Sequence, residues 1–217
     1  MHSDRAFDAD ALSGLRAQAA LHGLRIVAEH GYRAGHLSAA AAAEQVSRAH
    51  PAYVFAFGSA PEIEDLARKM DRSGSGAALL SSVAMAGRSV FDFPERIAAR
   101  TWLSYPSALP SEAEFGPFGG AMRNAGAKIQ NVALQSVAYG AARVFVEAMK
   151  VAGNRPTRAS LVSALERLND FHSGVVPPVT YGPNRRVGAV GSFVVRVDPA
   201  TRQQLAVTGW MVPAEAR

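Results

Sequence analysis

Helical and extended patterns of apolar residues alternate along most of this chain. Leu12, Leu15 and Ala19 recur at helical spacing, whereas the short apolar run at 52–57 has the length and composition of a buried strand. Acidic residues early and basic residues late in 61–72 suit the dipole of a helix there. The pattern predicts helices at 7–24, 39–49, 61–72, 112–124, 131–153 and 157–169, and strands at 25–32, 52–57, 77–81 and 97–105.

The last part of the chain predicts a β-hairpin. Val195 and Val197 occupy alternate positions before a turn at Asp198 and Pro199. Val207 lies on the returning segment, so one face of the hairpin is expected to be buried.

Alternation of helices and strands predicts an α/β fold with a doubly wound, mainly parallel sheet. In such sheets, ligands bind outside the carboxyl ends of the strands. Two predicted strands end in small polar residues, the first at Gly58 and Ser59 and the second at Ser81 and Ser82. We therefore expect these four residues to line a noncovalent pocket for a small solute.

Charge and composition exclude several other classes of function. The chain has 23 basic and 18 acidic residues, a net charge of +5, but no run of like charges, so nucleic acid is not expected as a partner. It contains no cysteine, which rules out disulfides and thiol chemistry. No apolar run reaches 18 residues, so membrane insertion is not expected.

Recognised catalytic and cofactor motifs are also missing from the sequence. The six histidines form no metal-binding pair, no G-x-S-x-G nucleophile turn occurs, and no glycine-rich phosphate loop is present. The sequence therefore predicts no catalytic residue, no metal and no cofactor. An enzyme built on paired carboxylates stays open, because acidic residues far apart in the chain can converge in space.

Four segments together resemble the type I periplasmic solute-binding proteins, the leucine/isoleucine/valine-binding receptor family of ABC transporters. Residues 4–8 (DRAFD) are similar to the family's D-x-x-Y-G, and 51–55 (PAYVF) to its P-D-x-V strand. Residues 58–62 (GSAPE) resemble its ligand-facing loop, and 138–141 (AYGA) its A-Y-D-A helix. The order and spacing of the segments carry the resemblance, which covers only the C-terminal portion of the family's length.

The resemblance implies a periplasmic-binding-protein-like type I fold with an incomplete lobe. Residues 1–106 and 189–217 would form the second, C-terminal lobe. Residues 107–188 would be returning helices and strands of the first lobe, whose N-terminal half is absent. The connection between the lobes is expected at 106–110.

The implied function is that of a truncated extracytoplasmic receptor subunit for ABC-type uptake of branched-chain amino acids or a related small solute. Binding would close a hinge between the lobes, without catalysis or cofactor, and a membrane permease would be the partner. The location would be periplasmic. Because residues 1–24 lack the pattern of an export signal, we expect any such signal outside this sequence.

The resemblance also adds Phe7 to the pocket and limits the ligand. Members that bind amino acids place an aromatic residue in the loop that resembles Ser59 and Ala60, and a carboxylate for the ligand ammonium in the loop that resembles Ser82 and Val83. A buried ammonium without a partner is costly. We therefore expect a solute that is recognised differently.

Two alternatives remain at this point, an α/β enzyme acting on small molecules and a ligand sensor not tied to transport. An enzyme predicts titratable residues clustered in the main cleft. The helix at 131–153 carries an apolar stripe, formed by Val137, Ala141, Val144, Phe145 and Ala148. If the first lobe is incomplete, this stripe stays partly exposed, which predicts self-association.

Overall fold

The structure is a computed structural model that describes residues 1–109 and 116–213. The described residues form two compact units. Unit 1 comprises Met1–Ser104 and Val195–Val207, and unit 2 comprises the described parts of Tyr105–Val194 and Thr208–Arg217.

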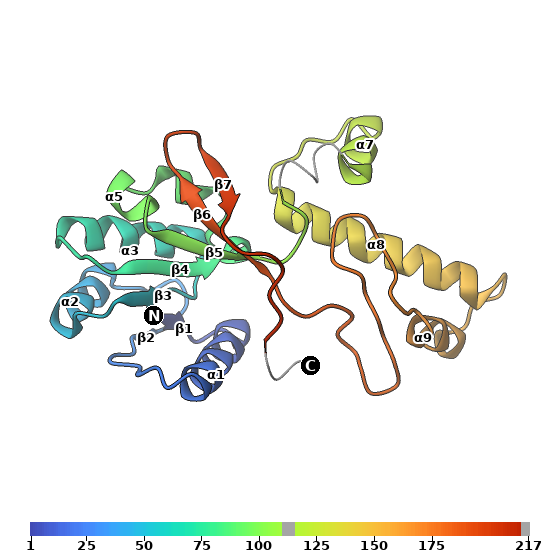
Figure 1. The fold of residues 1–217 in the computed structure, drawn as a ribbon, viewed down its shortest axis with the longest axis horizontal. Coiled ribbons are helices and arrows are strands. Elements are labelled where there is room, and N and C mark those ends of the chain that lie inside the picture. Colours follow the sequence, from blue (N-terminus) through green and yellow to red (C-terminus); the bar gives the residue numbers. More distant parts are fainter. Residues whose placement is uncertain (110–115, 214–217) are drawn as a thin grey trace. The chain divides into compact units, whose positions relative to one another are not determined.

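The elements follow one another as strands and helices along the chain (Figure 1). The strands are β1 (His2–Ser3), β2 (Gly31–Tyr32), β3 (Tyr53–Phe55), β4 (Ala78–Ser82), β5 (Thr101–Tyr105), β6 (Phe193–Asp198) and β7 (Gln203–Ala206). The helices are α1 (Ala6–Leu21), α2 (Ala39–Ala49), α3 (Ala60–Arg72), α4 (Val83–Ala86), the 3-10 helix η1 (Gly87–Asp92), α5 (Glu95–Ala98), α7 (Pro117–Asn124), α8 (Val132–Ala152) and α9 (Arg158–Glu166).

The main sheet has the strand order β3-β4-β5-β6-β7. Strands β3, β4 and β5 are parallel, and β6 pairs with β7 in antiparallel fashion, as predicted for the terminal hairpin. A parallel pair, β1 and β2, lies beside it: the Met1 nitrogen donates to the Phe55 carbonyl, and the Phe57 amide donates to the Met1 carbonyl, both at 2.9 Å. The α/β class and the mainly parallel sheet are confirmed.

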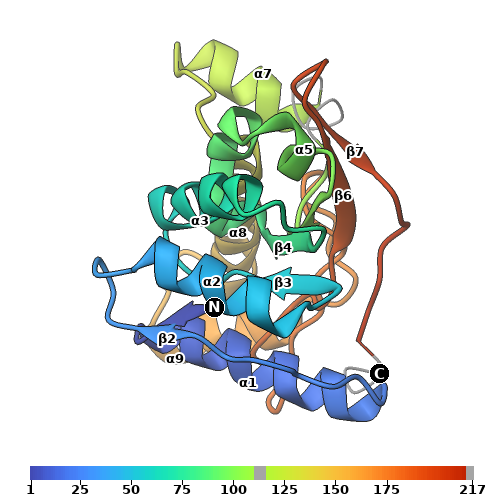
Figure 2. The ribbon, with the colours of Figure 1, turned by 90° about the vertical axis from the view of Figure 1, so that its left-hand side faces the viewer.

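The core of unit 1 forms where α3 packs on the sheet. Ile63, Leu66 and Met70 recur along one side of α3 and are fully buried, as are Leu79 of β4 and Leu103 of β5. Helices α2 and α3 pack against one another, and Figure 2 shows them side by side. Spacing of three or four residues therefore places one face of α3 on the sheet.

Unit 2 is built around the long helix α8, which begins at its cap Asn131 and ends before Gly153. Val144 and Ala148 are buried in a cluster with Ala164 of α9 and with Leu168. Phe145 of the predicted stripe, by contrast, is 51% exposed. The stripe is therefore only partly buried, because α9 covers one side of α8.

Three predicted elements differ in the structure. The strand expected at 25–32 is limited to Gly31–Tyr32, and the one expected at 97–105 begins only at Thr101. Ile97 instead lies in α5 and is fully buried there; burial in a short helix leaves the same apolar signal as burial in a strand. The helix expected at 112–124 begins at Pro117 in the structure, and residues 112–115 lie outside the described residues.

Candidate functional site

The carboxyl ends of parallel strands meet at one edge of unit 1. Ser3 of β1 pairs with Tyr32 of β2, and the hydrogen bonds of Met1 bring β1 alongside the end of β3. The next strand along, β4, ends at Ser82. We call this set of strand ends and the loops that follow them the carboxyl edge; it is the position at which open α/β sheets bind ligands.

Gly58 and Ser59 join the end of β3 to α3, as predicted, and Ser59 is the N-cap of that helix. The Glu62 carboxylate accepts hydrogen bonds from the Ser59 amide at 2.7 Å and from the Ser59 hydroxyl at 2.6 Å. Its other oxygen accepts from the Gly35 amide at 3.0 Å, in the loop after β2. Glu62 thus connects two loops of the carboxyl edge.

Partial burial alone would raise the pKa of Glu62. The hydrogen bonds from Ser59, Gly35 and Tyr32 outweigh that effect and hold the pKa below its ordinary value of 4.5. Burial raises the pKa of Tyr32 well above its ordinary value, and the neighbouring Glu62 charge raises it further. The site therefore holds a charged carboxylate next to a neutral phenol.

Tyr32 is packed directly against the loop after β3. Its hydroxyl lies 3.5 Å from the Phe57 carbonyl oxygen. A Cβ added to Gly58 would lie 2.3 Å from that hydroxyl oxygen and 3.2 Å from a carboxylate oxygen of Glu62. The absence of a side chain at Gly58 thus allows this close approach, whereas the sequence analysis predicted Gly58 as a residue that lines the pocket.

Ser81 and Ser82 have different surroundings at the end of β4. The Ser81 side chain is buried, and its hydroxyl donates to the Ala56 carbonyl at 2.8 Å. Ser82 is partly exposed and caps α4 by accepting from the Met85 amide at 3.3 Å. The next residue, Val83, is buried, so α4 begins without a carboxylate.

Phe7 lies in the first turn of α1, immediately after β1, and is 65% exposed. Its neighbour Asp8 is buried and accepts a hydrogen bond from the Ser3 hydroxyl. Asp4 accepts a 2.8 Å hydrogen bond from the Ala34 amide. Phe7 therefore presents an exposed ring, whereas the carboxylates of the nearby Asp4 and Asp8 already accept hydrogen bonds from other groups of the protein.

The predicted site residues did not include Tyr32, Gly35, Glu62 or Asp4, although Asp4 and Glu62 lie in segments that resemble those of the family. One of them carried a local signal, since a glutamate three residues after a serine is typical of a capping box. The bond of Glu62 to Gly35 spans 27 residues and leaves no such signal. Among the described residues, no group of three or more acidic or histidine side chains is placed to hold a metal ion.

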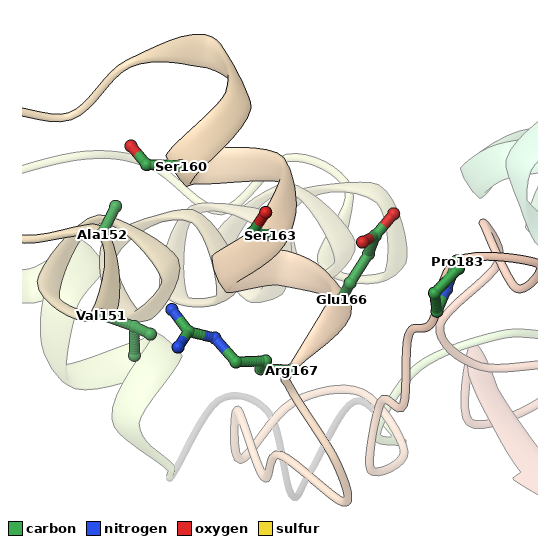
Figure 3. A pocket seen from close by; sticks show the side chains of 7 residues that line it. All are labelled: Val151, Ala152, Ser160, Ser163, Glu166, Arg167 and Pro183. Carbon is green, nitrogen blue, oxygen red and sulfur yellow. The ribbon is translucent and has the colours of Figure 1, made fainter.

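A separate cavity of about 540 Å³ lies within unit 2, between the end of α8, α9 and the turn at Pro183. Figure 3 shows Arg167 reaching toward Val151. Glu166, on another wall, forms a 2.6 Å ion pair with Arg186. None of the five predicted ligand-binding residues lines this cavity, so it is distinct from the carboxyl edge.

The sequence profile of the periplasmic binding protein family matches residues 1–203. This chain belongs to the periplasmic binding protein family. A comparison of the sequence with curated proteins gives no match.

Solved structures share the fold of this periplasmic binding protein. A branched-chain amino acid ABC transporter protein from Thermus thermophilus with bound valine has a TM-score of 0.82 at 19% identity, over 98% of this chain and 59% of that one. A fatty acid ABC transporter substrate-binding protein from Thermomonospora curvata has a TM-score of 0.80 at 15% identity, over 99% and 57%. A possible leucine/isoleucine/valine-binding protein from Rhodopirellula baltica has a TM-score of 0.76 at 20% identity, over 95% and 57%.

This periplasmic binding protein chain therefore spans less than two thirds of the length of these structures. The resemblance to the leucine/isoleucine/valine-binding type is confirmed at the level of fold. In the part of the chain that the structure describes, no helix combines the length and the apolar character needed to cross a bilayer.

Proposed function

We propose that this chain is part of a solute-binding receptor for ABC-type uptake, and that its carboxyl edge in unit 1 contacts the solute. The observation that carries the proposal is the family match over residues 1–203. In this proposal unit 1 belongs to the second lobe of the receptor and unit 2 supplies the returning part of the first. The receptor would be periplasmic and would deliver its solute to a membrane permease.

The residues proposed to contact the solute are Phe7, Ser59 and Ser82. Phe7 offers an exposed ring, and Ser59 and Ser82 are partly exposed, whereas Gly58 is buried under the Tyr32 hydroxyl and acts by letting that contact form. The Ser81 hydroxyl is already bound to Ala56, so Ser81 acts by holding strands β3 and β4 together.

The mechanism is noncovalent. The solute bridges the two lobes and shifts the equilibrium from open to closed by its greater affinity for the closed state. General acid–base catalysis at neutral pH favours groups with a pKa near 7. The pKa of Glu62 is lowered and that of Tyr32 raised, so both move away from that range, which favours binding over an enzymatic role.

The solute class follows from what the edge lacks. Ser82 caps α4 and Val83 is buried, so the loop that holds an ammonium-binding carboxylate in amino-acid receptors holds none here. One structural relative binds valine and another is a fatty acid receptor. We infer that the solute is a small molecule, such as an organic acid, that lacks a free amino group.

Isothermal titration of the complete gene product tests this proposal. The panel would hold valine, leucine, their amino-free analogues isovalerate and 4-methylvalerate, and octanoate. We expect binding in the micromolar range to an acid without an amino group, together with a decrease in the radius of gyration on scattering. If no solute of the panel binds and no closure occurs, the transport proposal is wrong.

A further inference from the structure

Glu62 has more contacts than a helix cap requires. A capping box needs only the bonds within the first turn of α3, here the bonds to the amide and hydroxyl of Ser59. The second carboxylate oxygen of Glu62 reaches the Gly35 amide at 3.0 Å, in a loop 27 residues earlier. One side chain thus binds the loops that follow two different strands.

We propose that Glu62 is a positioning residue that holds the loops at 33–38 and 57–59 in the single arrangement needed for solute binding. This inference rests on the proposed function, because both loops belong to the carboxyl edge. Glu62 does not need to touch the solute for this role. It acts through the backbone of Gly35 and Ser59.

Few other bonds hold the first of these loops. Strand β2 is only two residues long, so the sheet fixes little of the chain that follows it. The Ala34 amide is bound by Asp4 at 2.8 Å, and the next amide, Gly35, is bound by Glu62 at 3.0 Å. The His36 amide donates to the Arg33 carbonyl at 2.9 Å, but that bond lies within the loop. Charge-assisted bonds are about twice as strong as neutral ones, so the two carboxylates are the main restraints that join this loop to other elements.

The contact between Tyr32 and Gly58 also holds the end of β2 against the loop at 57–59. The Tyr32 hydroxyl would lie 2.3 Å from a Cβ at Gly58, so the phenol sits directly on the backbone of the second loop. Apart from burial, the charge of Glu62 raises the pKa of the Tyr32 phenol, because the two groups lie close to one another. A side chain from the end of β2, a glycine after β3 and a carboxylate from α3 therefore form one contiguous contact.

The charges around Glu62 keep the restraint in place at neutral pH. Burial raises the pKa of Tyr32, the charges of Glu62 and Asp8 raise it further, and the charge of Arg5 lowers it. The hydrogen bonds from Ser59, Gly35 and Tyr32 keep the pKa of Glu62 below 4.5. Protonation at low pH removes the charge from these bonds, so loop order should fall as pH falls through that lowered pKa.

Amide hydrogen exchange on the variants Glu62→Ala and Glu62→Gln tests the inference. Glu64→Gln is the matched control, because Glu64 lies on the same helix and, among the residues that the structure describes, pairs with the exposed Arg68 alone, at 2.7 Å. We expect Glu62→Ala to speed exchange at Gly35 and Ser59 by about tenfold or more, the loss of one charge-assisted hydrogen bond. Glu64→Gln should change neither amide.

A pH series separates positioning from a general loss of stability. In the wild type, the protection of Gly35 relative to an unstructured amide should fall below about pH 4.5. In Glu62→Gln that step should vanish, while urea unfolding shows that the variant is folded. Equal protection of Gly35 in wild type and Glu62→Ala would overturn the inference, and so would a pH step that persists in Glu62→Gln.

Solute titration of the complete gene product supplies the second arm, with valine, isovalerate and octanoate as probes. Glu62→Ala should weaken binding about tenfold, and Glu64→Gln should leave it unchanged. Unchanged binding in Glu62→Ala would overturn the positioning role while leaving the receptor function intact. If no probe binds the wild type, the proposed function fails, and the exchange result alone decides the inference about Glu62.

Discussion

The Ser81 hydroxyl donates a 2.8 Å hydrogen bond to the Ala56 carbonyl, which ties the end of β4 to the end of β3. Both residues are buried. The next residue, Ser82, is partly exposed and caps α4. Two adjacent serines that are alike in the sequence thus have different roles, one inside the sheet and one at its edge.

Ser81→Ala should destabilise the protein without changing solute affinity. Removing the hydroxyl leaves the buried Ala56 carbonyl with one bond fewer, at a cost of about 1–2 kcal/mol. Urea unfolding measures the change in the free energy of unfolding. A loss of solute binding in a folded Ser81→Ala protein would show instead that this hydroxyl contacts the solute.

Gly58→Ala should destabilise the carboxyl edge, because the added methyl group meets the Tyr32 hydroxyl at 2.3 Å. Overpacking of this kind typically costs about 1–3 kcal/mol. In Tyr32→Phe the blocking oxygen is absent, so the double variant should recover part of the loss. Thermal unfolding of both single variants and the double variant measures this coupling. Strict additivity would contradict the steric explanation.

Glu62 should make stability depend on pH in the acid range. Its pKa in the folded protein lies below the ordinary 4.5, so the unfolded state binds more protons between the two values. The stabilisation is fully present above the ordinary pKa and is lost as pH falls through the folded-state value. Urea midpoints from pH 3 to 7 should therefore decline less steeply in Glu62→Gln than in the wild type. Parallel curves would mean that Glu62 contributes nothing to this decline.

The isolated chain should self-associate through the exposed side of α8. Leu134, Phe145 and Val146 are 44%, 51% and 50% exposed on this helix. Phe145→Asp and Val146→Asp should each lower the association measured by sedimentation velocity, because a charge in an apolar contact is costly. Leu24→Asp is the control, since Leu24 is 67% exposed in unit 1. A monomer at all concentrations would contradict this prediction.

Much of the fold could be predicted because its signals are local. Residues 39–49 were expected as a helix and form α2, and the alternation of Val195 and Val197 correctly predicted the hairpin. Ser59 was expected after a strand, and the structure places it there, although Tyr53 of that strand is exposed rather than buried. Each of these signals depends on spacing within a few residues, which the order of the amino acids already contains.

The arrangement of the carboxyl edge could be decided only in three dimensions. No spacing rule connects Glu62 to Gly35 or Tyr32 to Gly58, because these contacts form only when separate strands take their places in one sheet. The same holds for Ser81, whose burial depends on the neighbouring strand, and for Phe145, whose exposure depends on which side of α8 is covered by α9. By itself, then, the order of residues determined most of the helices and strands and the approximate positions at which the strands end, but not the helix at Ile97 or the short extent of β2. Tertiary packing decided which polar groups at those ends bind one another, since that requires long-range contacts that local periodicity does not encode.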